Sequence, residues 1–153
     1  MPTTVATIED RKRLARRLAG SGRGFAEQYG FRVTNNPSSL FQLLCLSVLL
    51  ARRGDFRRAV DGAHALPDAG WDSAARLSSS SRSDRVRTLR DSGQRGDVEA
   101  LADLLGELAR AVVGRYRGDL RRLRSARVSE RLAWLVGALA RVDLEGRYAE
   151  LTG

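Results

Sequence analysis

The chain has 153 residues, enough for one domain that buries about two-thirds of the surface its unfolded chain exposes. Apolar residues make up 42% of it, which excludes wholesale disorder. A single cysteine and a single histidine exclude an intramolecular disulfide, a cysteine-ligated zinc site, an iron–sulfur cluster and a His-rich metal site, so no cofactor is predicted.

The net charge is +9, and Lys12 is the only lysine among the 27 basic residues. Residues 1–60 hold eleven basic and four acidic side chains, residues 61–100 hold six and seven, and residues 101–153 hold ten and seven. Two basic ends around a neutral middle favour a polyanionic partner, nucleic acid first and an anionic membrane surface second. The alternative is a solvated, arginine-rich surface without a partner.

The first predicted helix is capped by Thr7, and it carries no apolar stretch of the kind that a secretory signal needs. We therefore expect a cytoplasmic protein. The glycines of 20–24 loosen this helix; they follow no strand and lack the lysine and hydroxyl of a phosphate-binding loop.

An apolar run from Leu40 to Ala51 follows, with Asn36 as the expected N-cap and Pro37 in the first helical position. Twelve residues are too few to span a membrane, so the run predicts a buried core helix that contains Cys45 as a small hydrophobe. Four arginines follow in and after the turn at the end of this helix, and we expect them to form one positively charged surface, the basic corner. Its members are Arg52, Arg53, Arg57 and Arg58.

The next helix extends from Phe56 to about Leu66, with His64 among its alanines. Further helices are predicted to start in chain order at Asp72, at the serines of Ser78–Asp84, at Asp97, at Asp119, at Ser129 and at Asp143. No segment alternates as a strand does. We therefore predict one all-α domain over residues 1–153, a compact bundle of eight or nine short helices.

A second arginine cluster surrounds Asp119. Its members are Arg115, Arg117, Arg121, Arg122 and Arg124. Guanidinium groups bind phosphate bidentately, so both clusters are candidate sequence-independent phosphate contacts. A solvated face is the alternative for each cluster.

Four stretches in order carry a resemblance to a known family: "RGFAEQYGFRVTNNPSSLFQLLCLSVLLARR", "AVDGAHALPDAGWDSAARL", "DRVRTLRDSG" and "RYRGDLRRLR". They resemble the N-terminal helical part of actinobacterial proteins of the helix-hairpin-helix DNA glycosylase superfamily, the relatives of endonuclease III. The resemblance covers about Phe25 to Arg124, and residues 125–153 diverge from it. It implies a glycosylase-like helical fold and a function related to DNA repair.

The same family continues with a Leu-Pro-Gly-Ile-Gly hairpin, a catalytic aspartate and, in some members, a Schiff-base lysine. This chain has no proline after Pro67, and Lys12 matches no catalytic position of the family. Asp143 lies late enough in the chain, but without the hairpin a helix cap is its favoured role. No catalytic residue is assigned on this basis.

Three functions remain open. The favoured one is a non-catalytic, glycosylase-like domain that binds duplex DNA through its arginines without sequence preference. The second is a protein-interaction or homodimerisation module, in which the apolar C-terminal helix Leu132–Ala140 with Trp134 meets a partner. The third is a glycosylase or lyase with an unrecognised site, such as Asp143 with Glu145.

Overall fold

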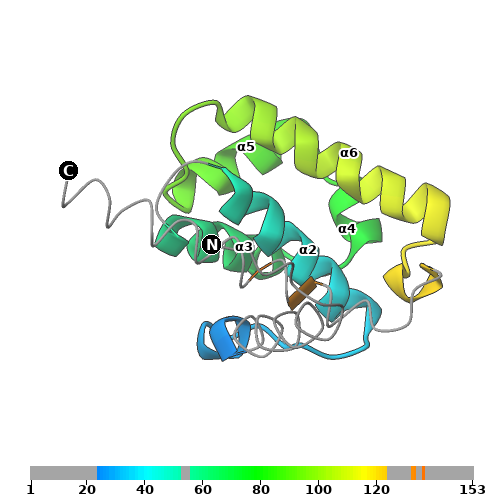
Figure 1. Cartoon of the computed structure of the whole chain (residues 1–153). Coiled ribbons are helices and arrows are strands. Elements are labelled where there is room, and N and C mark those ends of the chain that lie inside the picture. The colour runs from blue at the N-terminus through cyan, green and yellow to red at the C-terminus, as the bar shows by residue number, and fades with distance from the viewer. Residues whose placement is uncertain (1–23, 53–55, 124–131, 134–135, 137–153) are drawn as a thin grey trace, which may run out of the picture.

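The computed structural model describes residues 24–52, 56–123, 132–133 and 136, and the regular elements in these ranges are all helical. The elements with defined bounds are α2 (Pro37–Ala51), α3 (Phe56–Asp68), α4 (Ala74–Ser78), α5 (Arg82–Asp91), α6 (Val98–Tyr116) and the 3-10 helix η1 (Leu120–Arg122) (Figure 1). The predicted all-α class is confirmed.

The predicted number of eight or nine helices is wrong for the part of the chain that the structure describes, where six helices have defined bounds. Residues 24–28 are helical as well. The helices predicted to start at Thr7 and Asp143 lie outside the described residues, as does most of the one predicted from Ser129.

Helix α2 is the centre of the core. It begins at Pro37, and the Asn36 side chain accepts hydrogen bonds from the backbone N–H groups of Ser38 (3.0 Å) and Ser39 (3.4 Å), as the sequence predicts. Most of α2 is buried, and it packs against α3 and η1. No helix in the described ranges is both long and apolar enough to cross a membrane.

Helix α3 extends to Asp68, past the predicted end at Leu66 and through Pro67. Pro67 has no backbone N–H to donate to the carbonyl of Ala63, and the helix continues only one residue beyond it. His64 stacks on Phe31 with ring centroids 4.2 Å apart, and its Nε2 hydrogen-bonds the carbonyl of Tyr29. His64 therefore fastens residues 29–31 to α3.

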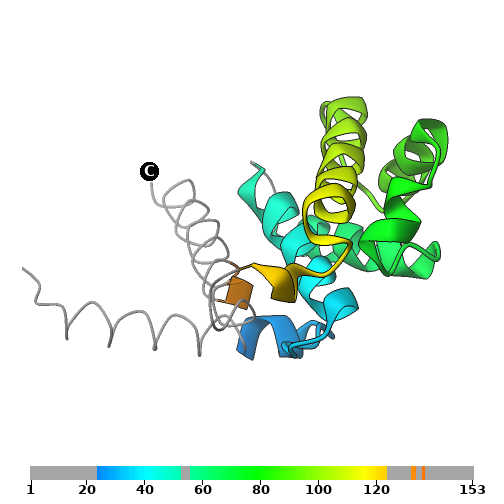
Figure 2. The same cartoon turned by 90° about the vertical axis from the view of Figure 1, so that its right-hand side faces the viewer.

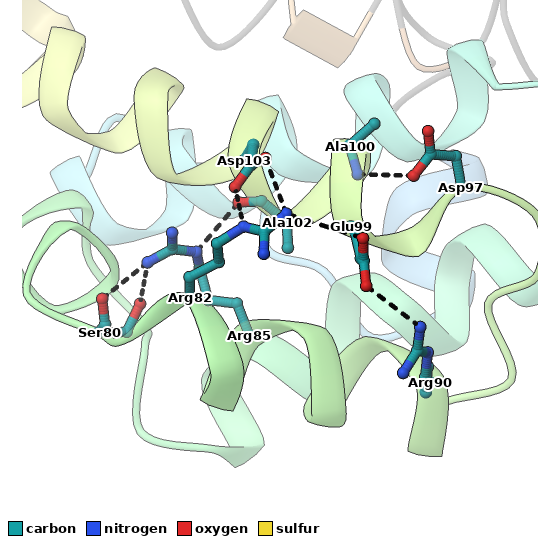
Figure 3. Close-up of polar contacts among 9 residues, drawn as sticks. All are labelled: Ser80, Arg82, Arg85, Arg90, Asp97, Glu99, Ala100, Ala102 and Asp103. Carbon is teal, nitrogen blue, oxygen red and sulfur yellow. Dashed lines mark hydrogen bonds and ion pairs between the residues drawn. The ribbon is translucent and has the colours of Figure 1, made fainter.

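Helices α4, α5 and α6 form the other half of the domain, and Arg85 lies between them (Figure 3). Arg85 is 4% exposed. Its Nε donates to the carbonyl of Ala102 (3.0 Å), and its Nη1 donates to the carbonyl (2.7 Å) and the hydroxyl (3.1 Å) of Ser80. Burial lowers the pKa of this guanidinium, and the neighbouring charge of Arg110 lowers it further.

Gly106 provides the space for Arg85. A Cβ on Gly106 would lie 2.7 Å from Nη2 and 2.8 Å from Cζ of Arg85, well inside van der Waals contact. Because the guanidinium is held by three hydrogen bonds, it cannot move aside without losing them. The pairing of Gly106 with Arg85 thus fixes α6 against the start of α5.

We predict that Gly106→Ala lowers the free energy of unfolding by about 1–3 kcal/mol, the usual cost of overpacking a core. Urea denaturation followed by circular dichroism measures it. Gly114→Ala is the matched control, because Gly114 lies in the same helix and a Cβ there meets nothing within 4 Å. That change should instead stabilise the protein by about 0.5–1 kcal/mol. Equal effects of the two substitutions would contradict this role of Gly106.

Candidate nucleic-acid interface

Three arginines of the predicted basic corner lie at the end of α2 and the start of α3. Arg52 is the C-cap residue of α2, and Arg57 and Arg58 lie in the first turn of α3. Arg57 is exposed, and Arg52 and Arg58 are half-buried. Arg53 lies outside the described residues.

The structure adds an arginine from a distant part of the sequence to this corner. The Nη2 of Arg52 donates to the carbonyl of Arg95 (3.3 Å), which lies in the turn between α5 and α6. Arg95 itself is exposed. We call the set Arg52, Arg57, Arg58 and Arg95 the first basic surface.

Gln94 fastens this turn to α3. Its side-chain amide donates to the carbonyl of Arg58, and it lies directly over Gly62, where a Cβ would come within 2.6 Å of its nitrogen. Gly93 and Gly96 flank the pair 94–95 with φ values of 94° and 79°, a conformation that favours glycine. Arg95 is not among the residues predicted from the sequence, although these two glycines are a signal for such a turn.

The second cluster lies where α6 ends. Arg115 is in the last turn of α6, Arg117 is its left-handed C-cap residue with φ 52°, and Arg121 and Arg122 belong to η1. All four are exposed. We call Arg115, Arg117, Arg121 and Arg122 the second basic surface; Arg124 lies outside the described residues.

Asp119 neutralises one member of the second basic surface. Its side chain caps η1 by accepting from the backbone N–H of Arg121 (3.0 Å), and its carboxylate accepts from Nε (2.9 Å) and Nη2 (2.9 Å) of the same arginine. The side-chain hydrogen bonds from Arg121 lower the pKa of Asp119. Asp119 is the only acid between residues 110 and 124 of the sequence, so the other arginines there keep their charge uncompensated by near sequence neighbours.

The exposed arginines of α4 and α5 are placed differently, because carboxylates neutralise them. Arg76 pairs with Asp72 (3.3 Å), Arg87 with Asp84, and Arg90 with Glu99 (3.8 Å). Arg82 bonds Asp103 at 2.7 Å and lies 3.9 Å from Glu99 (Figure 3). By contrast, no ion pair joins Arg58, Arg95, Arg115, Arg117 or Arg122 to a carboxylate of the described residues.

The two basic surfaces lie at opposite ends of α6. The first adjoins the turn before Val98 and the second begins at Arg115, so the 19 residues of α6 separate them by about 28 Å. Helices α2 and α6 run in roughly opposite directions, so that the end of α2 meets the start of α6 (Figure 1). Figure 2 faces the other end, where η1 lies beside α2.

Neither the single thiol nor the possible metal ligands of the described residues form a reactive site. Cys45 is buried, and burial raises the pKa of its thiol to about 12. The thiol therefore stays protonated and packs as a small hydrophobic side chain. No three His, Cys, Asp or Glu side chains of the described ranges gather as a metal site would need. Lys12, Asp143 and Glu145 lie outside these ranges.

The C-terminal helix predicted as a partner surface is described at Leu132, Ala133 and Val136. Ala133 and Val136 are 1% and 0% exposed and join the core, and Leu132 packs against it. These apolar side chains are thus covered within the chain itself. Trp134 lies outside the described residues.

Comparisons of the chain with protein-family models, with curated proteins and with solved structures find no match. The resemblance to the helix-hairpin-helix glycosylases therefore stays a prediction.

We predict that Arg121→Gln raises the pKa of Asp119 toward its ordinary value. Arg122→Gln should change that pKa little, because the charge of Arg122 contributes only a small part of the lowering. Because the folded-state pKa of Asp119 is depressed, its contribution to stability is present above its unfolded pKa and is lost as the pH falls through its folded pKa. NMR titration of the Asp119 carboxyl carbon in the three proteins measures this. Equal shifts in both variants would contradict the assigned hydrogen bonds.

Proposed function

We propose that this domain binds duplex nucleic acid through its phosphates, without sequence preference and without catalysis. The supporting observation is the division of its arginines into two populations. Arg76, Arg82, Arg87 and Arg90 of α4 and α5 are ion-paired with acids, whereas Arg58, Arg95, Arg115, Arg117 and Arg122 at the two ends of α6 form no ion pair with a described carboxylate.

An arginine that is ion-paired gains little by meeting a phosphate, because it must first give up its carboxylate. An exposed guanidinium without a carboxylate partner can take a phosphate bidentately at no such cost. Each contact would release condensed counterions from the duplex, so affinity should fall steeply as salt rises. Contacts of this kind position a protein on the duplex backbone and read no bases.

Packing supports the non-catalytic form of the proposal. His64 is occupied by the Tyr29 carbonyl and the Phe31 ring, and Cys45 is enclosed in the core. Neither side chain is placed to act on a flipped base or its sugar. A function related to DNA repair enters the proposal only through the resemblance to the glycosylases.

Partnership through the apolar C-terminal helix is the weaker alternative. Ala133 and Val136 of that helix are buried in the domain's own core and Leu132 is partly buried against it, so these three residues do not offer the exposed apolar patch that a partner would cover.

We predict that the chain binds a fluorescent duplex with an affinity that falls steeply between about 50 and 200 mM salt. The double substitution Arg58→Ala/Arg95→Ala should flatten the slope of log affinity against log salt by about 1.8, because each lost phosphate contact contributes about 0.9. Fluorescence anisotropy at several salt concentrations measures both quantities.

The matched control is Arg76→Ala/Arg87→Ala, which removes the same net charge from arginines that are paired with Asp72 and Asp84. It should leave the slope nearly unchanged, since those arginines make no phosphate contact in this proposal. If both double variants weaken binding equally, net charge alone attracts the duplex and the first basic surface is not a site. Absence of binding by the unsubstituted chain at low salt would overturn the proposed function.

A duplex that contains an abasic site belongs in the same titration. Equal affinity for intact and abasic duplexes is the result expected of phosphate contacts alone. Clear preference for the abasic duplex would instead support a lesion-directed function of the kind that the resemblance implies.

A further inference from the structure

The two basic surfaces could bind nucleic acid in two arrangements. Both could contact the same duplex, or each could contact a separate one. Their separation by the length of α6, about 28 Å, corresponds to roughly eight base pairs of duplex. It also exceeds three Debye lengths at physiological ionic strength, which are about 8 Å each. Charge at one surface therefore does little to attract a phosphate to the other.

A single straight duplex that touches both surfaces would have to run alongside the elements that connect them. The first twelve residues of α6, 98–109, contain three acids and no base. The acids are Glu99, Asp103 and Glu107, which recur at the four-residue spacing of one helix face. Because Glu99 and Asp103 are ion-paired with arginines of α5, this part of α6 offers a phosphate backbone no uncompensated positive charge.

The neighbours of α6 do not change this result. Arg82 and Arg90 of α5 are ion-paired with Glu99 and Asp103, so they are already neutralised (Figure 3). The exposed Leu104, with 48% of its surface accessible, adds an apolar rather than a basic side chain to α6. Helix α2, which also joins the two ends, has no charged residue at all.

We propose that the first and second basic surfaces bind two separate duplex segments, so that one copy of this chain bridges them. This inference rests on the proposed function and extends it from binding to bridging. Among the described residues, Arg58 and Arg95 of the first surface and Arg115, Arg117 and Arg122 of the second form no ion pair with a carboxylate, and Asp119 bonds Arg121 of the second. Each therefore has the charge for several phosphate contacts of its own.

The test mixes the full chain with two populations of a short duplex of about ten base pairs, roughly one helical turn, one carrying a donor fluorophore and the other an acceptor. Sedimentation velocity should give two duplexes per chain, and energy transfer should rise when the protein is added and fall when it is in excess. Arg58→Ala/Arg95→Ala and Arg115→Ala/Arg122→Ala should each bind one duplex per chain and lose the energy transfer.

The outcomes separate the two proposals. No binding by the unsubstituted chain removes the proposed function and bridging together. Binding of one duplex per chain at every protein concentration, weakened by both double variants, would show that the surfaces share a duplex and would overturn bridging alone. Energy transfer that persists in a single-surface variant would also overturn it, since two copies, each holding one duplex, would then be joining them.

Discussion

The guanidinium of Arg85 lies against α6 at Gly106, and the pairing of the charged side chains of α5 with those of α6 depends on that contact. It bonds Ser80 at the start of α5 and Ala102 in α6, so it sets the two helices at a fixed distance and in a fixed register. The neighbouring ion pairs from Arg82 and Arg90 to acids of α6 require that register. A buried cation with only neutral oxygens around it is costly, and three hydrogen bonds offset the loss of water.

The arginines beyond the ends of α6 are placed by other contacts. Arg82 and Arg90 are ion-paired with Glu99 and Asp103 in the first half of that helix. The turn before α6 is bonded to α3 through Gln94 and to the end of α2 through Arg52, so Arg95 lies in a turn that is tied to both helices. Ion pairs between α5 and α6 thus neutralise arginines beside the first half of α6, and separate contacts hold the arginines at its ends.

Local signals in the sequence predicted most elements because their causes are local. Asn36, Asp97 and Asp119 each accept a hydrogen bond from a backbone N–H within three residues. The starts of α2, α6 and η1 could therefore be predicted from the local sequence. The Asp72 start was one cap too early, because the Ser73 hydroxyl accepts the bond from Arg76 instead. The predicted end of α3 was also early, since a proline in a last turn costs one donor and does not stop the helix.

What could not be predicted depends on contacts between distant residues. The burial of Arg85 needs the missing side chain of Gly106, 21 positions later, and the place of Arg95 needs Gln94 to reach α3 across 36. In the sequence, Arg85 looks like any other arginine of a polar helix, and Arg95 looks like part of a neutral middle. Net charge by segment therefore identified a basic domain correctly but could not tell a paired arginine from an exposed one. That distinction, rather than the number of arginines, decides where a phosphate can bind.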